Sequence, residues 1–348
     1  MNTDSATRSL DDRSENACTL SVVVPAYNEA EVLEAFHRRL LAALADAGVT
    51  FEVIYADDGS TDATPRILTQ LRAIDSRVGI LRLSRNFGKE HAMSAGLQYA
   101  RGAATVVIDA DLQDPPELIP AMLAAWRDGA DVVDMRRRSR SGESWLKRAT
   151  AYLFYRVINR LSEVPIPHDT GDFRLLSRRA VDALNDMPER NRFMKGLFAW
   201  IGFEHTSLLY DREPRAAGTS KWRYWKLWNF ALEGITSFSV SPLKVASYVG
   251  ILTALLAFAY AAYFLIKTLA SGDPVPGFPT LIVVISFLGG LQLMAIGILG
   301  EYVGRLFLET KRRPLYLVDE FRAPNLQART LRGQGGVERA PAEVALEI

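Results

Sequence analysis

Short apolar runs alternate with longer stretches in which apolar and polar residues mix. The runs occupy residues 19–24, 51–56, 78–84, 103–108 and 130–135. Each is apolar at successive positions and is bounded by polar or turn residues, which is typical of a strand buried on both faces. The stretches between them predict helices near 29–47, 62–74, 90–100 and 117–127. This alternation predicts an α/β fold, a Rossmann-like, mainly parallel sheet with helices on both faces.

Local signals place the ends of these elements. Pro25 should end the first strand, and Asn28 should cap the helix that follows it. Thr61 or Asp62 should cap the second helix, while Pro115 and Pro116 open the fourth. Beyond the fifth strand the pattern predicts a helix over 143–161, a short strand after 169–174 and another helix within 187–200. No Gly-x-Gly-x-x-Gly follows the first strand, which argues against a dinucleotide site.

Two segments near the C-terminus carry no charge, residues 245–266 and 279–300. As helices they would each span about 33 Å, enough for a hydrocarbon core of about 30 Å. The alternative is a pair of buried core helices, but such helices seldom run so long without a charge. Residues 222–238 mix aromatic side chains with Arg and Lys. They predict a helix in the membrane interface, although packing against the soluble domain is not excluded.

Basic residues flank the two segments unequally. Lys and Arg precede the first segment and follow the second, whereas the connecting loop, 269–278, has neither, although Lys267 lies at the edge of the first segment. The positive-inside rule therefore predicts that both termini and the N-terminal domain are cytoplasmic. We expect a disordered leader (1–18), a catalytic domain (19–221), an interfacial helix region (222–243), two transmembrane helices (244–304) and a basic segment with a flexible tail (305–348).

Composition narrows the function classes. The net charge of +1 over 348 residues does not favour nucleic-acid binding. The lone Cys18 excludes an intramolecular disulfide and argues against a cysteine metal site. The four histidines share no ligand spacing, and we interpret all of them as structural or incidental. His37 is expected on the surface of its helix.

Two acidic clusters, at 57–62 (DDGSTD) and 109–111 (DAD), each follow a predicted strand directly. Open α/β sheets bind their ligands at the carboxyl ends of their strands, where these side chains should meet. Oxygen ligands in an Asp-x-Asp arrangement suit Mg²⁺ or Mn²⁺ bridging to a diphosphate. The sequence therefore predicts a nucleotide-sugar site at this edge.

Four motifs in order complete a resemblance: residues 24–29 (VPAYNE), 57–62 (DDGSTD), 109–114 (DADLQD) and 169–174 (DTGDFR). Together they resemble the family 2 glycosyltransferases, and in particular the polyprenyl-phosphate branch with dolichol-phosphate mannose synthases and bactoprenol glucosyltransferases. Residues 189–193, the 215–222 segment and the two apolar segments strengthen the resemblance, which covers about 19–316. It implies a GT-A fold and sugar transfer from a nucleotide donor to a lipid phosphate. The Gln-x-x-Arg-Trp motif and additional spans of processive synthases are absent.

The resemblance also implies residue roles, which we list by group. The metal and diphosphate site would comprise Asp109, Asp111 and Gln113, and the nucleoside pocket Pro25, Tyr27, Glu29 and Asp57. The segment with Arg215, Ser220 and Lys221 would close over the donor diphosphate. Lys89 could approach a donor phosphate or be a solvated surface lysine. Pro25 and Tyr27 could equally be packing or turn residues, and Asp58 and Asp62 are expected in turn and cap roles.

Asp172 is expected to hold the donor sugar or orient the acceptor, with Arg174 as its ion-pair partner. Arg136, Arg137, Arg138 and Arg148 are candidates for the acceptor phosphate, since a guanidinium binds two phosphate oxygens. A basic surface facing anionic lipids is the alternative. A phosphate monoester has a second pKa of about 6, so a dedicated general base is not required.

The resemblance predicts an inverting glycosyltransferase on the cytoplasmic face of a bacterial inner membrane, with polyprenyl phosphate as acceptor. UDP-glucose is the first choice of donor; GDP-mannose, UDP-N-acetylglucosamine and a UDP-pentose stay open, as does a homo-oligomer. The rival from another class is a non-catalytic membrane scaffold that keeps the fold.

Overall fold

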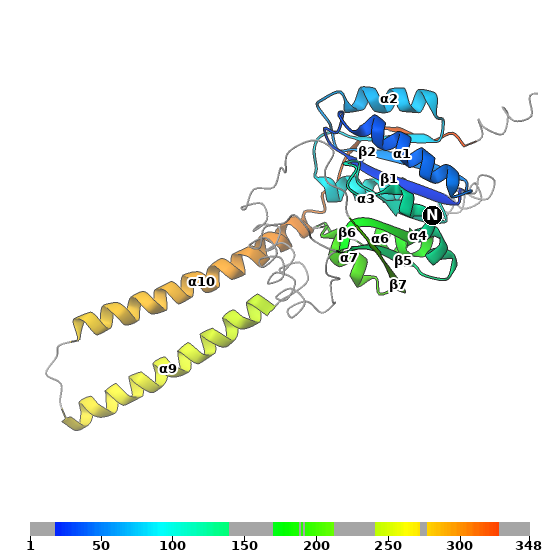
Figure 1. The fold of residues 1–348 in the computed structure, drawn as a ribbon. Helices are drawn as coiled ribbons and strands as arrows, with labels where there is room; N and C mark the ends of the chain where they lie inside the picture. The colour runs from blue at the N-terminus through cyan, green and yellow to red at the C-terminus, as the bar shows by residue number, and fades with distance from the viewer. Residues whose placement is uncertain are drawn as a thin grey trace, which may run out of the picture.

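The computed structural model describes residues 18–138, 170–187, 189–190, 192–211, 241–271 and 277–326. In this part of the chain, an eight-stranded sheet with strand order β7-β5-β6-β4-β1-β2-β3-β8 forms the body of the molecule (Figure 1). The five predicted strands are β1 (Leu20–Ala26), β2 (Phe51–Asp57), β3 (Val78–Leu83), β4 (Ala104–Val107) and β5 (Val132–Arg137). The remaining strands are β6 (Thr170–Ser177), β7 (His205–Tyr210) and β8 (Val318–Arg322).

Strand directions confirm a mainly parallel sheet. β1 runs parallel to both β2 and β4, β2 runs parallel to β3, and β5 runs parallel to β7. β6 is antiparallel to β4 and β5, and β8 is antiparallel to β3 at the sheet edge. β6 corresponds to the short strand predicted after residues 169–174, but it begins at Thr170, so most of that motif is strand and not turn. β7 and β8 were not predicted.

Helices cover both faces of the sheet, as expected. On one face, a buried cluster joins the sheet to α1 (Leu33–Asp46), α2 (Thr64–Ile74) and α4 (Ile119–Arg127), which follows a short turn of 3-10 helix, Pro116–Leu118. On the other, a second cluster joins it to α3 (Lys89–Tyr99), α6 (Arg178–Asp186) and α7 (Met194–Trp200). The sheet therefore separates two hydrophobic cores and contributes side chains to both of them. The predicted helix over 143–161 lies outside the described residues.

Four local predictions were wrong. Neither Thr61 nor Asp62 is the N-cap residue of α2, which is Ala63, without a side-chain capping bond. Asn28 does not cap α1: its φ is 54°, and its side-chain oxygen accepts from Thr61 N at 2.9 Å. Pro25 does not end β1, which continues to Ala26. His37 is not on the surface. It is 6 % exposed, with Nδ1 2.8 Å from Tyr55 Oη, and burial lowers its pKa.

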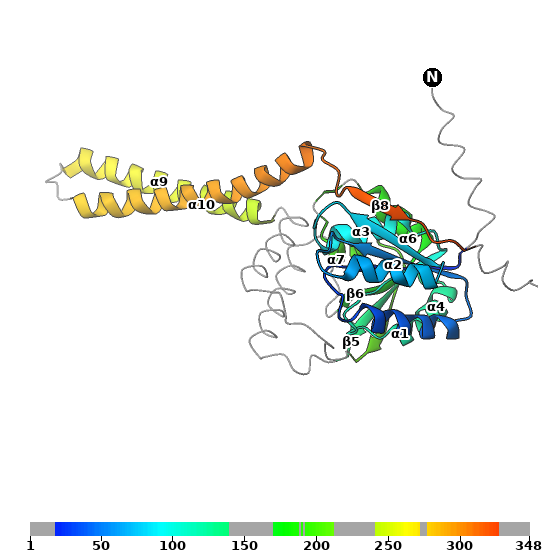
Figure 2. The same cartoon turned by 90° about the horizontal axis from the view of Figure 1, so that it is seen from above.

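Two long helices, α9 (Ser241–Ser271) and α10 (Phe278–Thr310), project away from the sheet side by side (Figures 1 and 2). By length and composition each could cross a membrane, within Leu243–Tyr260 and Phe287–Thr310. Their large apolar side chains face outward; Phe258 is 74 % and Leu293 72 % exposed. A pair of buried core helices would hide these side chains, so that alternative is wrong.

Candidate functional site

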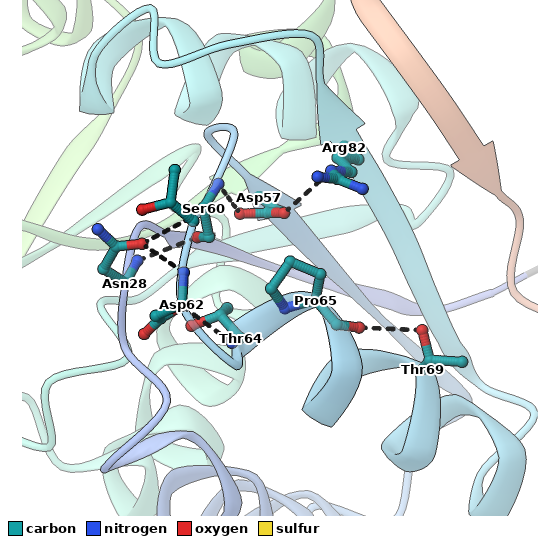
Figure 3. A network of polar contacts seen from close by, with 9 residues as sticks. Asn28, Asp57, Ser60, Asp62, Thr64, Pro65, Thr69 and Arg82 are labelled. Carbon is teal, nitrogen blue, oxygen red and sulfur yellow. Dashed lines mark hydrogen bonds and ion pairs between the residues drawn. The ribbon is translucent and has the colours of Figure 1, made fainter.

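The carboxyl edge of the sheet gathers the acidic side chains that the sequence singled out. Asp57 is the last residue of β2, and Asp109 and Asp111 follow β4 directly. Asp57 is fully buried; its Oδ1 accepts from Ser60 N at 2.9 Å, and its Oδ2 lies 3.8 Å from Arg82 Nε (Figure 3). Asp57 is therefore held between the loop after its own strand and the neighbouring strand β3.

The loops after β1 and β2 are bonded to each other. Asn28 N donates to Ser60 Oγ at 3.0 Å, and Glu29 N donates to Thr64 Oγ1 at 3.0 Å. Asn28 Oδ1 in turn accepts from Thr61 N (Figure 3). These bonds fix the segment that carries Tyr27, which is 36 % exposed beside the buried Pro25. The structure thus brings the predicted nucleoside-pocket residues to one edge and leaves the Tyr27 ring partly open to a ligand.

Lys89 bridges two carboxylates from different strands. Its Nζ lies 2.7 Å from Asp109 Oδ2 and 2.5 Å from Asp172 Oδ2, which is on β6. The side chains of Lys89, Asp109 and Asp172 are 42 %, 20 % and 12 % exposed, so the cluster opens to solvent mainly through the lysine. Lys89 is therefore ion-paired with two carboxylates while its side chain stays exposed to solvent.

The bridge sets the charge of the cluster. Burial raises the pKa of Asp109 to about 6, although the Lys89 ammonium acts in the opposite direction. Burial also disfavours the charge on Asp172, but Lys89, together with Lys195 and Arg174, outweighs this effect and holds the pKa of Asp172 well below its usual range. Desolvation would lower the pKa of Lys89, yet the two carboxylates raise it well above its ordinary value. Lys89 is thus a fixed cation at the sheet edge.

Asp58 positions the loop that ends at Lys89. It is 2 % exposed, and its two carboxylate oxygens accept from Phe87 N at 2.7 Å and Gly88 N at 2.9 Å. At Gly59, φ is +69° and a Cβ would lie 2.5 Å from the Arg85 carbonyl carbon, so this close approach requires glycine. Asp58 therefore has the structural role in a turn that the sequence predicted, and this turn lies next to the site. Asp62 likewise bonds backbone, accepting from Thr64 N.

The acidic loop after β4 is the candidate metal site. Asp111 Oδ1 accepts from Gln113 N at 3.1 Å, and Leu112 between them has a φ of 61°, a rare conformation for a bulky residue. Among the described residues no group of three His, Cys, Asp or Glu side chains could hold a metal. Mg²⁺ is commonly held by one or two carboxylates together with substrate phosphates and water. Asp109 and Asp111 fit that arrangement.

The sequence predicted an ion pair between Arg174 and Asp172, but Arg174 pairs with Asp134 instead. Its Nη1 lies 3.2 Å from Asp134 Oδ1, and its Nη2 donates to Gly171 O at 2.8 Å. Arg174 and Asp134 are both nearly fully buried. This pair ties β6 to β5, and Lys89 takes the role of counter-ion to Asp172.

The arginines after β5 do not form one cluster. β5 extends through Arg137, and successive strand residues point to opposite faces. Arg136 is exposed, while Arg138 is exposed and lies 3.4 Å from Asp211. Arg137 lies on the other face, near Gly171 and Tyr210. Strand alternation therefore turns Arg137 away from Arg136, and the assignment of the three arginines to the acceptor phosphate stays a prediction. Arg148, Arg215, Ser220 and Lys221 lie outside the described residues.

The structure adds residues that the sequence reasoning missed. Tyr210 Oη donates to the buried Asp114 at 2.5 Å, which fixes the end of the acidic loop. Glu90, beside Lys89 in α3, has its pKa raised to about 8 by burial and then by the charge of Asp172. Asp114 could have been found as the last residue of the DADLQD motif, and Glu90 as the neighbour of a candidate lysine. Tyr210 carried no sequence signal.

Comparison with known proteins adds family information. The family model described as "Glycosyl transferase family 2" matches residues 21–184, and "GtrB C-terminal hairpin" matches residues 241–306. An uncharacterized glycosyltransferase of Synechocystis is 53 % identical over 301 residues, 86 % of this chain and 95 % of that one. The bactoprenol glucosyl transferase of Shigella phage SfV is 46 % identical over 299 residues, 86 % of this chain and 97 % of that one.

Solved structures resemble this one more distantly. A Pyrobaculum calidifontis mannosyltransferase in complex with GDP-Man and Mn²⁺ is 18 % identical, with a TM-score of 0.44, covering 83 % of this chain and 88 % of its own. Staphylococcus aureus TarS 1–349 in complex with UDP is 20 % identical, with a TM-score of 0.39, covering 56 % of this chain and 59 % of its own. Such distant likenesses assign no substrate.

Proposed function

The chain belongs to glycosyl transferase family 2, and we propose that it moves a sugar from a nucleotide diphosphate to polyprenyl phosphate. That it is a glycosyltransferase with a GT-A fold follows from its family; the donor and the acceptor are the proposal. One observation carries it: Asp109, Lys89 and Asp172 meet at the carboxyl edge of the sheet. UDP-glucose is the first choice of donor, because relatives aligned over 86 % of this chain are named bactoprenol glucosyl transferase. GDP-mannose, UDP-N-acetylglucosamine and a UDP-pentose stay open.

The side chains at the carboxyl edge of the sheet each have a role in such a transfer. The acceptor phosphate oxygen attacks the anomeric carbon as the bond from that carbon to the diphosphate breaks, in one inverting displacement. The phosphate needs little deprotonation, since its second pKa is about 6. Asp172 orients the sugar or the acceptor, and Lys89 holds Asp172 charged and in place. Positioning of the two reactants then supplies a large part of the rate enhancement.

A divalent cation would be held by Asp109 and Asp111, with Gln113 next to them. Mg²⁺ or Mn²⁺ bound there would neutralise charge on the leaving diphosphate. On the nucleoside side, the exposed Tyr27 ring can pack against a base, and Glu29 offers a carboxylate acceptor, with the buried Asp57 behind these residues at the end of β2. Asp57 is already held by Ser60 N, so its position is fixed before a nucleotide arrives.

A donor panel tests this function. Purified full-length protein is incubated in detergent with polyprenyl phosphate and each labelled nucleotide sugar in turn, with Mg²⁺ or Mn²⁺, and label is counted in the organic phase. The proposal expects one donor to label the lipid, with UDP-glucose first. If no donor places label in the organic phase, the proposal is contradicted and the scaffold alternative is favoured.

We further propose that α9 and α10 cross a membrane with both termini cytoplasmic. The outward-facing apolar side chains of both helices support a lipid surrounding. In a Cys18→Ala background, Ser271→Cys should react with an impermeant thiol reagent added to intact spheroplasts. Ser5→Cys should react only after lysis. Protection of position 271 together with labelling of position 5 in intact spheroplasts means that the orientation is reversed.

The acceptor phosphate is best matched to Arg136 and Arg138. In the pairing of β5 with β6, Arg136 lies opposite Thr170, two residues before Asp172, and Arg138 follows the end of β5 directly. Replacing Arg136 and Arg138 with Gln should raise the KM for polyprenyl phosphate and leave donor affinity, measured by calorimetry, unchanged. A control that replaces the exposed Arg66 and Arg127, on α2 and α4, loses the same charge at remote positions. Weaker donor binding with unchanged acceptor dependence would assign these arginines to the nucleotide.

A further inference from the structure

The chain does not end at the second apolar helix. Residues 309–325, which we name the C-terminal strap, run from the last turn of α10 through β8 to Asn325. They lie outside both family-model matches, which end at residues 184 and 306. We propose that the strap fixes the catalytic sheet relative to α9 and α10, so that the site faces an acceptor phosphate held in a bilayer. This inference rests on the proposed function.

The strap is attached to the catalytic domain at its first residue. Glu309 Oε1, in the last turn of α10, accepts from Arg190 N at 2.8 Å, between α6 and α7. The chain then turns at Arg312, whose φ of 48° lies in the left-handed region. α10 is thus bonded to the catalytic domain before it ends, and the turn directs the chain back to the sheet.

A second attachment joins the strap to α3. The Tyr316 hydroxyl is hydrogen-bonded to the side-chain oxygen of Gln98 in α3. Next to it, Leu317 O accepts from Ser84 N at 2.9 Å, just beyond the end of β3. These two contacts hold the helix that begins at Lys89 and the loop that leads to it.

The third attachment is β8 itself, which covers the edge of β3 (Figure 2). Ile80, Leu81 and Arg82 pair with Arg322, Phe321 and Glu320. The centroids of the Phe321 ring and of the Tyr99 ring, at the end of α3, lie 4.3 Å apart. Beyond β8, Asn325 N donates to Ser76 O at 2.7 Å. An open strand edge is a site for wrong pairing, so this cover also protects the sheet.

The elements under the strap lead directly to the site. β3 carries Arg82, which lies 3.8 Å from Asp57. The loop after β3 is held by Asp58 and ends at Lys89. A continuous set of bonded segments therefore connects α10 to Lys89. If α10 crosses the membrane, the strap determines how the site is oriented toward the lipid surface.

Two truncations form a matched pair. A stop codon at Pro314 removes β8 and the tail, whereas a stop codon at Gln327 removes only the tail beyond the strap. Each protein is reconstituted in vesicles with long-chain polyprenyl phosphate, and separately assayed with a short-chain, water-soluble polyprenyl phosphate. A misplacement of about 1 Å can cost roughly 10²-fold in rate. We therefore expect the Pro314 truncation to keep nucleotide affinity and to lose long-chain transfer at least tenfold more than short-chain transfer; the Gln327 truncation should match wild type.

A substitution distinguishes an effect of the strap's position from misfolding of the truncated protein. At Gly79 an added Cβ would lie 2.8 Å from Pro324 Cδ, so Gly79→Ala should displace the strap without deleting it. The same selective loss of long-chain transfer is expected. Equal use of both acceptors in both strap variants overturns the inference, as does joint loss of nucleotide binding and of both transfers in Gly79→Ala. Failure of the wild-type protein to use either acceptor overturns the proposed function instead, and the strap inference with it.

Discussion

Asp111→Ala should lower turnover by roughly 10²–10³-fold, about 2.7–4 kcal/mol of transition-state stabilisation, as when other electrostatic stabilisers are removed. Asp111 stands at the carboxyl edge of the sheet, in a loop where Gln113 N bonds its carboxylate. The side chain is partly exposed, so its loss should change the thermal unfolding temperature little. Turnover in Mg²⁺ and Mn²⁺ and thermal unfolding are the two measurements.

Asp128→Ala is the matched control, because Asp128 is an exposed carboxylate that follows α4. It should have wild-type turnover. Near-normal turnover of Asp111→Ala in either metal would contradict the assignment of the acidic loop to the diphosphate.

Lys89→Met should be the second most damaging change, with a turnover loss of roughly 10²-fold. It leaves Asp109 and Asp172 without the ammonium that lies 2.7 Å and 2.5 Å from them. Two like charges then face each other, and neither carboxylate keeps its position. Because Lys89 is 42 % exposed, solvent weakens the ion pairs and the loss of folding stability should be modest.

Lys89→Arg separates charge from geometry. The guanidinium keeps the positive charge but has a different shape and reach, so this variant should recover only part of the turnover. The measurement is kcat for both variants beside their urea unfolding curves. Wild-type turnover in Lys89→Met would mean that the bridge has no part in the reaction.

The sequence was sufficient for β1 to β5 because strands buried on both faces leave long apolar runs. It was not sufficient for β8, which covers an edge and has only the mixed run Val318–Arg322. The pairing of β8 with β3 also joins segments more than 200 residues apart, so no local pattern encodes it. The first strand and the loop after it were predicted. The role of Asn28 was not, because its side chain bonds a loop more than 30 residues away in the sequence.

The site was predicted as a set of carboxylates at strand ends, and the structure places Asp57, Asp109 and Asp111 there. The contact of Lys89 with Asp172 spans 83 residues and exists because β6 enters antiparallel beside β4. The three arginines were grouped because the predicted strand ended at residue 135. β5 continues to Arg137, so strand alternation separates them. Local patterns predict the edge of the sheet, and long-range pairing decides which side chains meet on it.

Calorimetric titration of the full-length protein with UDP tests whether this edge of the sheet is a metal-assisted nucleotide-sugar site. The titration is run with Mn²⁺ and with EDTA, for the wild-type protein and for Asp111→Ala, and repeated with GDP. We expect the wild-type protein to bind one of the two nucleotides in Mn²⁺, and this binding to be lost both in EDTA and in the variant. Binding that is equal under all of these conditions, or no nucleotide binding under any of them, would contradict it.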